Sequence, residues 1–273
     1  MQEINPSSVL ALKIEMHFNG QFLSTGTAFV VQSSGGPLLL TNRHNVTGRD
    51  NRTGALLSKT AAEPNEIVIS HHVRGRLGSW TKRTEPLFLG ELFKPRWHEH
   101  PVYKEKADFV ALPLTQLIDI ELFPCPITEQ SPHIVVGPAE PVSVIGFPFG
   151  NSARGFPIWA TGFVASDPDI NYDDLPILLV DCRTRQGQSG SPVVAFRSAG
   201  LIKYSDGSSI AMSNGQARFM GIYSGRMNVE SDIGIVWKAS AIRELVALAE
   251  GKYRPNYAGA GAYNVAAVQP CFT

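Results

Sequence analysis

Short apolar runs recur along the whole chain, and clusters of glycine, proline, asparagine and serine separate them. This pattern is typical of many short β-strands and differs from a regular alternation of strands and helices. It predicts strands over Val9–Met16, Thr25–Gln32, Pro37–Thr41, Glu66–Ser70, Phe109–Leu114, Pro141–Gly146, Ile158–Ser166, Ile177–Cys182, Ser191–Phe196, Ala217–Tyr223 and Gly234–Trp237. The pattern therefore indicates an all-β fold.

Three other segments depart from the strand pattern. Apolar residues recur at helical spacing between Ala239 and Glu250, where Ser240 can cap the start of a helix and Gly251 can end it. Several prolines interrupt residues 114–138, which we interpret as a linker between two halves. Residues 252–273 are rich in glycine, alanine and tyrosine without a clear period. We therefore predict units at 1–120 and 121–251, and a tail at 252–273.

The composition fits a globular protein without a strongly charged partner. Of 273 residues, 43% are hydrophobic and 18% are charged, and 24 lysines and arginines balance 24 aspartates and glutamates. A nucleic-acid-binding protein usually carries a basic excess, so we expect no nucleic-acid partner. One local basic cluster is interpreted as a solvated loop face: Arg74, Arg76, Lys82 and Arg83.

The sequence also bears on location and on metals. No apolar run approaches the roughly 20 residues of a membrane-spanning helix, and no secretory signal is visible at the N-terminus. The odd set of cysteines is interpreted as reduced thiols: Cys125, Cys182 and Cys271. These features predict a cytoplasmic protein that does not bind membranes. Four histidines cluster, but no cysteine or regular acid spacing completes a tetrahedral set, so we expect no metal and no cofactor: His71, His72, His98 and His100.

Two stretches supply a base and an acid for an activated hydroxyl. A hydroxyl is a poor nucleophile at neutral pH, and it needs a base within hydrogen-bond reach and an acid that holds the base in one tautomer. His44 follows the apolar residues Leu38–Thr41, and Asp108 stands at the head of the apolar strand Phe109–Leu114. Because a buried carboxylate requires a partner, we expect Asp108 to pair with His44.

A third stretch surrounds Ser189. Residues 187–192 read Gly-Gln-Ser-Gly-Ser-Pro and lead into an apolar strand. The nucleophile elbow of α/β-hydrolases instead has a glycine at the position of Ser191 and a helix after it. Gly187 has no Cβ, so the loop can direct the amides of Gly187 and Ser189 into one cavity, as an oxyanion hole requires. Taken alone, the stretch fits an ordinary turn equally well.

Together the three stretches resemble those of trypsin-like serine peptidases, and more closely the bacterial HtrA-type branch than the secreted digestive enzymes. The likeness covers residues 20–245 and includes the turn Gly146–Gly150 and the segment 232–237 before the helix. Ser191 departs from the usual glycine, and a long gap after Ser189 predicts a hairpin near residues 205–214. No segment resembling a PDZ domain follows.

The resemblance implies a chymotrypsin-like fold of two six-stranded Greek-key β-barrels with a C-terminal α-helix. The first barrel, at 1–120, would carry His44 and Asp108, and the second, at 121–251, would carry Ser189. It implies a serine endopeptidase that hydrolyses polypeptides through an acyl-enzyme, with a catalytic triad of these three residues and an oxyanion hole formed by Gly187 and Ser189.

The resemblance also suggests how substrate binds. Extended peptides bind by adding a strand, and the matching segment includes Ile222, Tyr223 and Ser224. Arg183 lies six residues before the nucleophile, and with Arg226 it would line the primary pocket and favour an acidic or polar side chain.

The sequence bears on activation, and it leaves alternative functions open. Gln188 replaces the aspartate that secreted relatives use for activation by cleavage, so we expect the chain to be active as made. The same triad can serve an esterase. The fold can also act as a catalytically silent binding module, and a regulatory protein partner stays open.

Overall fold

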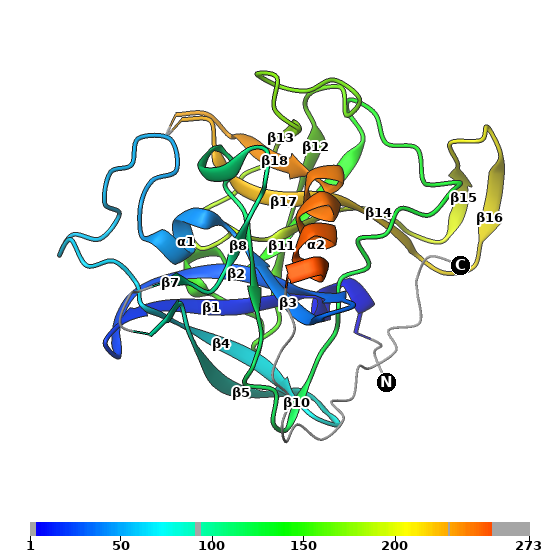
Figure 1. The fold of residues 1–273 in the computed structure, drawn as a ribbon. Coiled ribbons are helices and arrows are strands. Elements are labelled where there is room, and N and C mark those ends of the chain that lie inside the picture. The colour runs from blue at the N-terminus through cyan, green and yellow to red at the C-terminus, as the bar shows by residue number, and fades with distance from the viewer. Residues whose placement is uncertain (1–3, 91–93, 229, 253–273) are drawn as a thin grey trace.

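Two β-sheets, one from each half of the chain, make up most of the computed structural model, which describes residues 4–90, 94–228 and 230–252 (Figure 1). The all-β prediction with a C-terminal helix is confirmed. The helix α2 (Ala239–Lys252) contacts strands of both halves. Its predicted end at Gly251 is wrong, because the helix continues through that residue to Lys252.

The elements of the N-terminal half are η1 (Pro6–Val9), β1 (Ala11–Phe18), β2 (Gln21–Ser33), β3 (Gly36–Thr41), α1 (Arg43–Thr47), β4 (Glu66–Val73), β5 (Arg76–Pro86), β6 (Phe88–Leu89), β7 (Lys94–Pro95), β8 (His98–Glu99), η2 (Lys104–Lys106), β9 (Val110–Pro113) and β10 (Ile120–Glu121). Those of the C-terminal half before α2 are β11 (Pro141–Gly146), η3 (Pro148–Gly150), β12 (Ile158–Val164), β13 (Ile177–Asp181), β14 (Pro192–Arg197), β15 (Gly200–Lys203), β16 (Ser209–Met212), β17 (Gln216–Arg226) and β18 (Ile233–Lys238).

The C-terminal half closes into a six-stranded barrel in the order β11-β12-β13-β18-β17-β14. The N-terminal half forms an eight-stranded sheet in the order β10-β4-β1-β2-β3-β9-β8, with β5 beside β4. The prediction of six strands per half therefore holds for the C-terminal barrel and is exceeded in the N-terminal sheet. The two additional strands at its ends, β8 and β10, have two residues each, which is too short to leave a pattern in the sequence. The exact division at residue 120 stays a prediction.

Strand β3 explains why an unbroken apolar run forms a strand here. Successive side chains of a strand point to opposite faces, and every residue of β3 is buried. Leu38 and Leu40 pack into the core shared with α2 and the second barrel, whereas Leu39 packs into the core of the N-terminal sheet. Each fully buried leucine contributes about 1.5–3 kcal/mol, so burial on both faces fixes β3 and the residues that follow it.

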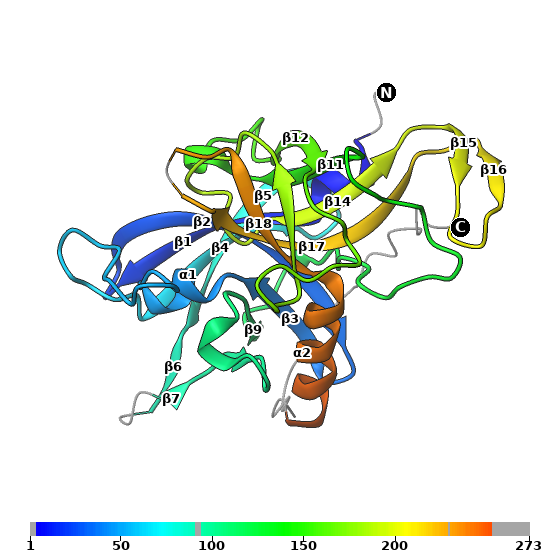
Figure 2. The same cartoon turned by 90° about the horizontal axis from the view of Figure 1, so that it is seen from above.

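The basic cluster was interpreted as part of a loop, and the structure shows that this is wrong. Arg76, Lys82 and Arg83 lie in the eleven-residue strand β5, which pairs with β4 along its length. Most of its side chains are exposed, which is why the segment shows no apolar alternation. The predicted hairpin after the nucleophile is present as β15 and β16, which extend away from the barrel (Figure 2).

In the described ranges, no helix is both long and apolar enough to cross a membrane. Cys125 and Cys182 are buried free thiols. Cys271 and the tail at 253–273 lie outside the described residues.

Candidate active site

His44 follows strand β3, as the sequence predicts, and lies on a one-turn helix that the sequence does not predict. β3 ends at Thr41, and α1 begins two residues later. Gly48 follows the helix with φ 67°, and its N–H donates to the His44 carbonyl oxygen at 2.9 Å. A Cβ at Gly48 would lie 2.6 Å from Pro64 Cδ, so both the backbone conformation and the space require glycine. The turn holds the histidine at the end of a buried strand.

Asp108 is buried just before β9, where the pairing of Thr41 with Val110 brings it beside α1. Its Oδ1 accepts the backbone N–H of His44 at 3.0 Å, and its Oδ2 lies 2.7 Å from His44 Nδ1. Ser224 Oγ, on β17 of the other half, donates to the same Oδ2. Three donors therefore compensate for burying the carboxylate.

The contact with Asp108 sets the state of the His44 ring. Burial lowers the pKa of His44, but the Asp108 charge and hydrogen bond outweigh burial, so this pKa is raised above its ordinary value of 6.5. In the neutral ring, Nδ1 donates its hydrogen to the carboxylate, which leaves the lone pair of Nε2 available as a base.

Ser189 is fastened to the half of the chain that carries His44. Its carbonyl oxygen accepts hydrogen bonds from the Thr27 N–H at 2.9 Å and from Asn45 Nδ2 at 3.3 Å. Its hydroxyl donates to the Ser224 carbonyl oxygen at 3.3 Å. Among the described hydrogen bonds, none joins the Ser189 and His44 side chains. Residues of β2 and α1 thus hold the loop that carries Ser189, while the Ser189 hydroxyl is hydrogen-bonded to β17.

The loop before Ser189 has a backbone conformation that requires glycine at position 187. Gly187 has φ 93°, and a Cβ there would lie 2.4 Å from the Phe147 carbonyl oxygen. Gln188 is buried, and its Oε1 accepts the Arg185 N–H at 2.7 Å, which closes the turn. Within the described contacts, the N–H groups of Gly187 and Ser189 donate to no acceptor. Two backbone donors are therefore available next to the serine.

These groups line one cavity of about 1030 Å³, which includes His44, Asp108, Gly187, Ser189 and Ser224 in its wall. Apolar and aromatic side chains line another part of the wall: Leu175, Ile177, Ile235, Trp237 and Tyr172. The cavity can therefore hold a substrate that combines a polar reacting group with apolar substituents.

The residues predicted to bind substrate divide into two groups. Ser224 and Arg226 line the cavity. Ile222 and Tyr223 are buried, and the backbone N–H and C=O of Tyr223 are bonded to Ser191 and Gly190. Arg183 is exposed and is not part of the cavity wall. The structure therefore does not bring Ile222, Tyr223 and Arg183 to the reacting groups.

Sequence reasoning missed three polar side chains that support the site. Ser224 was assigned to substrate binding alone, and its hydroxyl contacts Asp108 as well. Asn42 Nδ2 donates to the Asp108 carbonyl oxygen at 2.6 Å, and Thr27 Oγ1 donates to the Gly187 carbonyl oxygen at 2.8 Å. Polar residues within or just after otherwise apolar stretches were the available signal, since a buried polar group needs a partner.

The clustered histidines lie apart from this site. His71 and His72 are buried in β4, and His100 Nε2 lies 3.2 Å from Glu244 Oε2. In the part of the chain that the structure describes, no three histidine, cysteine, aspartate or glutamate side chains are placed to hold a metal ion. The expectation of no metal stays a prediction.

A family model described as a trypsin-like peptidase domain matches residues 26–202 of the chain. A comparison with curated protein sequences finds no match to this chain. A thermostable serine protease, AL20, from an extremophilic microorganism has a similar structure, with a TM-score of 0.50, 12% identity, and coverage of 89% of this chain and 98% of that chain.

Two further structures are similar over most of the chain. The serine endoprotease from Yersinia pestis has a TM-score of 0.48 and 14% identity, with 89% of this chain and 64% of that chain covered. The present chain thus spans less than two thirds of that protein. The Rv3671c protease from M. tuberculosis, in its active form, has a TM-score of 0.46 and 15% identity, with 95% and 86% covered.

Proposed function

The chain belongs to the trypsin-like peptidase domain family, and from this premise we propose that it is a serine endopeptidase. Ser189 is the nucleophile, His44 is the general base, and Asp108 holds and stabilises the base. The observation that carries the proposal is that the His44–Asp108 pair, joined at 2.7 Å, lines the same cavity as Ser189. The order histidine, aspartate, serine along the chain is the one found in the chymotrypsin fold.

Acylation begins when the Ser189 hydroxyl leaves the Ser224 carbonyl and turns toward His44 Nε2. Ser189 Oγ forms a bond to the carbonyl carbon of the peptide while its proton passes to Nε2, and the π electrons move onto the carbonyl oxygen. The N–H groups of Gly187 and Ser189 bind this oxyanion, and each such donor contributes about 10²–10³ in kcat.

The same imidazole completes both halves of the reaction. His44 gives the proton to the leaving nitrogen as the carbon–nitrogen bond breaks, which leaves Ser189 acylated. A water molecule then loses a proton to His44 and attacks the ester, and collapse returns the proton to Ser189. Asp108 stabilises the imidazolium at both stages without taking its proton.

We place the extended substrate along Ser224–Arg226 and not along Ile222–Ser224. Ser224, Gly225 and Arg226 line the cavity, whereas the backbone of Tyr223 is bonded within the protein. Arg226 then lies beside the bound chain and favours an acidic side chain near the cleaved bond. Profiling a peptide library against wild type and Arg226→Gln tests this, because the wild type alone should prefer acidic residues; equal preference would contradict it.

Cleavage of an unfolded protein tests the activity itself. Reduced, carboxymethylated casein is incubated with the wild type, with Ser189→Ala and with Ser191→Ala, and new N-termini are identified by mass spectrometry. Wild type and Ser191→Ala should release the same peptides, and Ser189→Ala none. Hydrolysis of an aryl ester without any casein cleavage would favour the esterase instead.

A further inference from the structure

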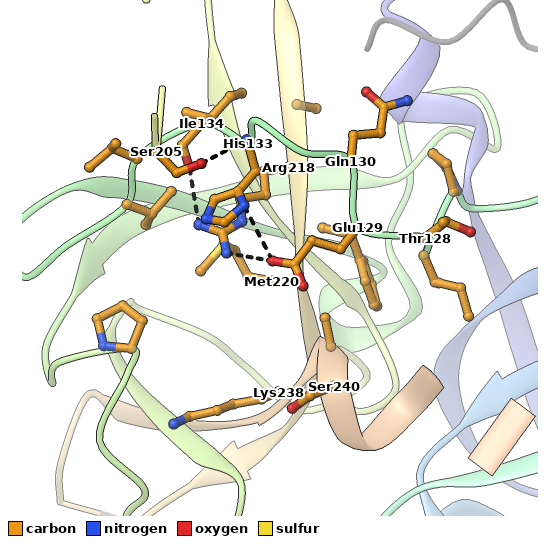
Figure 3. A pocket seen from close by; sticks show the side chains of 18 of the residues that line it. Thr128, Glu129, Gln130, His133, Ile134, Ser205, Arg218, Met220, Lys238 and Ser240 are labelled. Atoms are coloured by element: carbon orange, nitrogen blue, oxygen red, sulfur yellow. Dashed lines mark hydrogen bonds and ion pairs between the residues drawn. The ribbon is translucent and has the colours of Figure 1, made fainter. Parts of the chain in front are cut away.

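A second cavity, of about 480 Å³, lies between the linker that joins the two halves, strand β17 and the start of α2 (Figure 3). Among the described residues, it shares none with the cavity that holds Ser189. Its volume falls within the usual range of ligand sites, about 300–1000 Å³. The cavity is therefore large enough to hold a ligand, and the proposed peptidase reaction does not use it.

Glu129, a linker residue, places its carboxylate between two arginines of the C-terminal half. Arg218 Nη2 donates to Glu129 Oε1 at 3.1 Å, and Arg243 Nη2 donates to Oε2 at 2.9 Å. The same guanidinium groups donate to linker carbonyl oxygens, Arg218 to Ile134 at 3.0 Å and Arg243 to Ile127 at 3.2 Å. In Figure 3, Glu129 extends from the linker toward Arg218. The arginines are thus held in place by the backbone and share one carboxylate.

The charge of the cavity wall as a whole favours an anion. Arg218, Lys238 and Arg243 line the cavity against Glu129 and Asp169, so positive side chains exceed negative ones by one. Burial lowers the pKa of Arg218, and the neighbouring carboxylates oppose that change. The first residues of α2, Ala239 and Ser240, also line the cavity and add the positive end of the helix dipole.

The rest of the wall combines apolar and polar side chains. The apolar lining includes Ile127, Ile134, Val136, Leu178, Phe219 and Met220. A guanidinium pair matches a carboxylate in geometry and charge, while the apolar wall matches an aliphatic chain. A bare inorganic anion would leave this wall unused.

We propose that this cavity is a binding site for an aliphatic carboxylate, and that Glu129 occupies its anion position as an internal ligand. An incoming carboxylate replaces the Glu129 side chain on Arg218 and Arg243, while its carbon chain lies on the apolar wall. Because Glu129 belongs to the linker, its replacement by the ligand breaks one contact between the linker and the C-terminal barrel. The free acid and the C-terminus of a peptide share this chemistry.

The internal ligand gives the proposal an unusual test, since its removal should improve binding. A site that is open for only a fraction of the time binds more weakly by that fraction. Glu129→Ala should therefore raise the affinity for hexanoate by about tenfold or more. Arg243→Ala in the Glu129→Ala protein should remove this binding, and alanine keeps α2 helical. Arg218→Ala should act alike if it folds.

Calorimetric titration in a Ser189→Ala background measures binding without cleavage, so the result does not depend on the peptidase proposal. The probes are hexanoate with hexanamide, and acetyl-Ala-Ala-Leu with its C-terminal amide. Glu140→Ala removes a carboxylate from another arginine, Arg197, and is the matched control. It should leave the affinity unchanged.

Binding of hexanoate alone assigns the site to a free acid, and binding of the peptide acid alone assigns it to a chain terminus. Either result supports the proposal. Equal affinity for acids and amides overturns it, as does unchanged affinity in Glu129→Ala, or binding that persists in both Arg243→Ala and Arg218→Ala.

Discussion

Ser224 Oγ donates a hydrogen bond to Asp108 Oδ2, the oxygen that also lies 2.7 Å from His44 Nδ1. Ser224 is on β17 of the second barrel, and Asp108 precedes β9 in the first half. The backbone carbonyl oxygen of Ser224 also accepts a hydrogen bond from the Ser189 hydroxyl at 3.3 Å. One residue therefore connects Asp108 and Ser189 across the two halves.

Ser224→Ala should lower kcat by about ten- to hundredfold, because a hydrogen bond to a charged group contributes about 1.5–3 kcal/mol. The backbone carbonyl is kept, so the change should appear in kcat more than in KM. Ser191→Ala is the control: its hydroxyl is buried near the nucleophile without a partner among the described residues. A Ser224→Ala enzyme with normal kcat would contradict the assigned contact.

Gly187→Ala tests the oxyanion loop. The glycine has φ 93°, and a Cβ would lie 2.4 Å from the Phe147 carbonyl oxygen, so the loop must shift. Loss of one donor predicts a decrease in kcat of about 10²–10³ with the fold retained by circular dichroism. Gly207→Ala imposes a similar backbone strain, at φ 85°, in an open hairpin turn where a Cβ meets no neighbour, and it should leave kcat unchanged. Comparable losses in both variants would assign the effect to strain alone.

The triad should behave as a unit. Ser189→Ala and His44→Ala should each lower kcat by about 10⁴–10⁶, and the double variant should be hardly worse than either. Asp108→Asn should keep the fold and lower kcat by about 10⁴, because the amide favours the wrong histidine tautomer. Steady-state kinetics on a peptide substrate measure all four enzymes. Additive losses, or a near-normal Asp108→Asn, would mean that another acid or base acts.

The sequence predicted well wherever one physical requirement dominates a short stretch. A buried acid at the head of an apolar strand demands a partner, so Asp108 could be paired with His44 before the structure was known. Gly187 was predicted to need a tight backbone path, and the structure gives it φ 93°, a conformation that favours glycine. All eleven predicted strands overlap strands of the structure, since each carries enough apolar surface to show a pattern.

The sequence did not predict features that depend on packing between residues distant in the chain. The side chain of Ser224 could face a substrate or Asp108, and only the meeting of β17 with the first half selects Asp108. Strand β5 is polar because its side chains are exposed, so its pairing with β4 leaves no apolar signal. Glu129, Arg218 and Arg243 are distant in sequence, and their cavity has no local motif.

Acid should destabilise the fold through the buried histidines of β4. Burial lowers the pKa of His71 to about 3 and that of His72 to about 4, from an ordinary 6.5. The folded state keeps both rings neutral, whereas the unfolded chain binds protons below pH 6.5. The stability they contribute is complete above that pH and is lost as pH falls toward 3–4, by about 1.4 kcal/mol per pH unit for each proton.

Replacing one ring isolates this effect. His72 packs against Trp80, Phe123 and Phe156, so His72→Phe keeps an aromatic contact without a titrating group. Urea unfolding between pH 7 and 4 should show a shallower loss of stability in His72→Phe than in the wild type. Identical slopes would show that these histidines do not set the acid sensitivity.

The most direct test of the account is labelling of the 273-residue chain with a fluorophosphonate, which reacts only with a serine that has a working base and oxyanion hole. Gln188 closes the oxyanion turn by accepting the Arg185 N–H at 2.7 Å, so no new N-terminus is needed to order it. We predict that the intact chain is labelled as made, that the modified residue is Ser189, and that Ser189→Ala is unlabelled. Labelling of Ser189→Ala at the wild-type rate, or a folded wild type that stays unreactive as made, whether or not N-terminal trimming later activates it, would contradict the account.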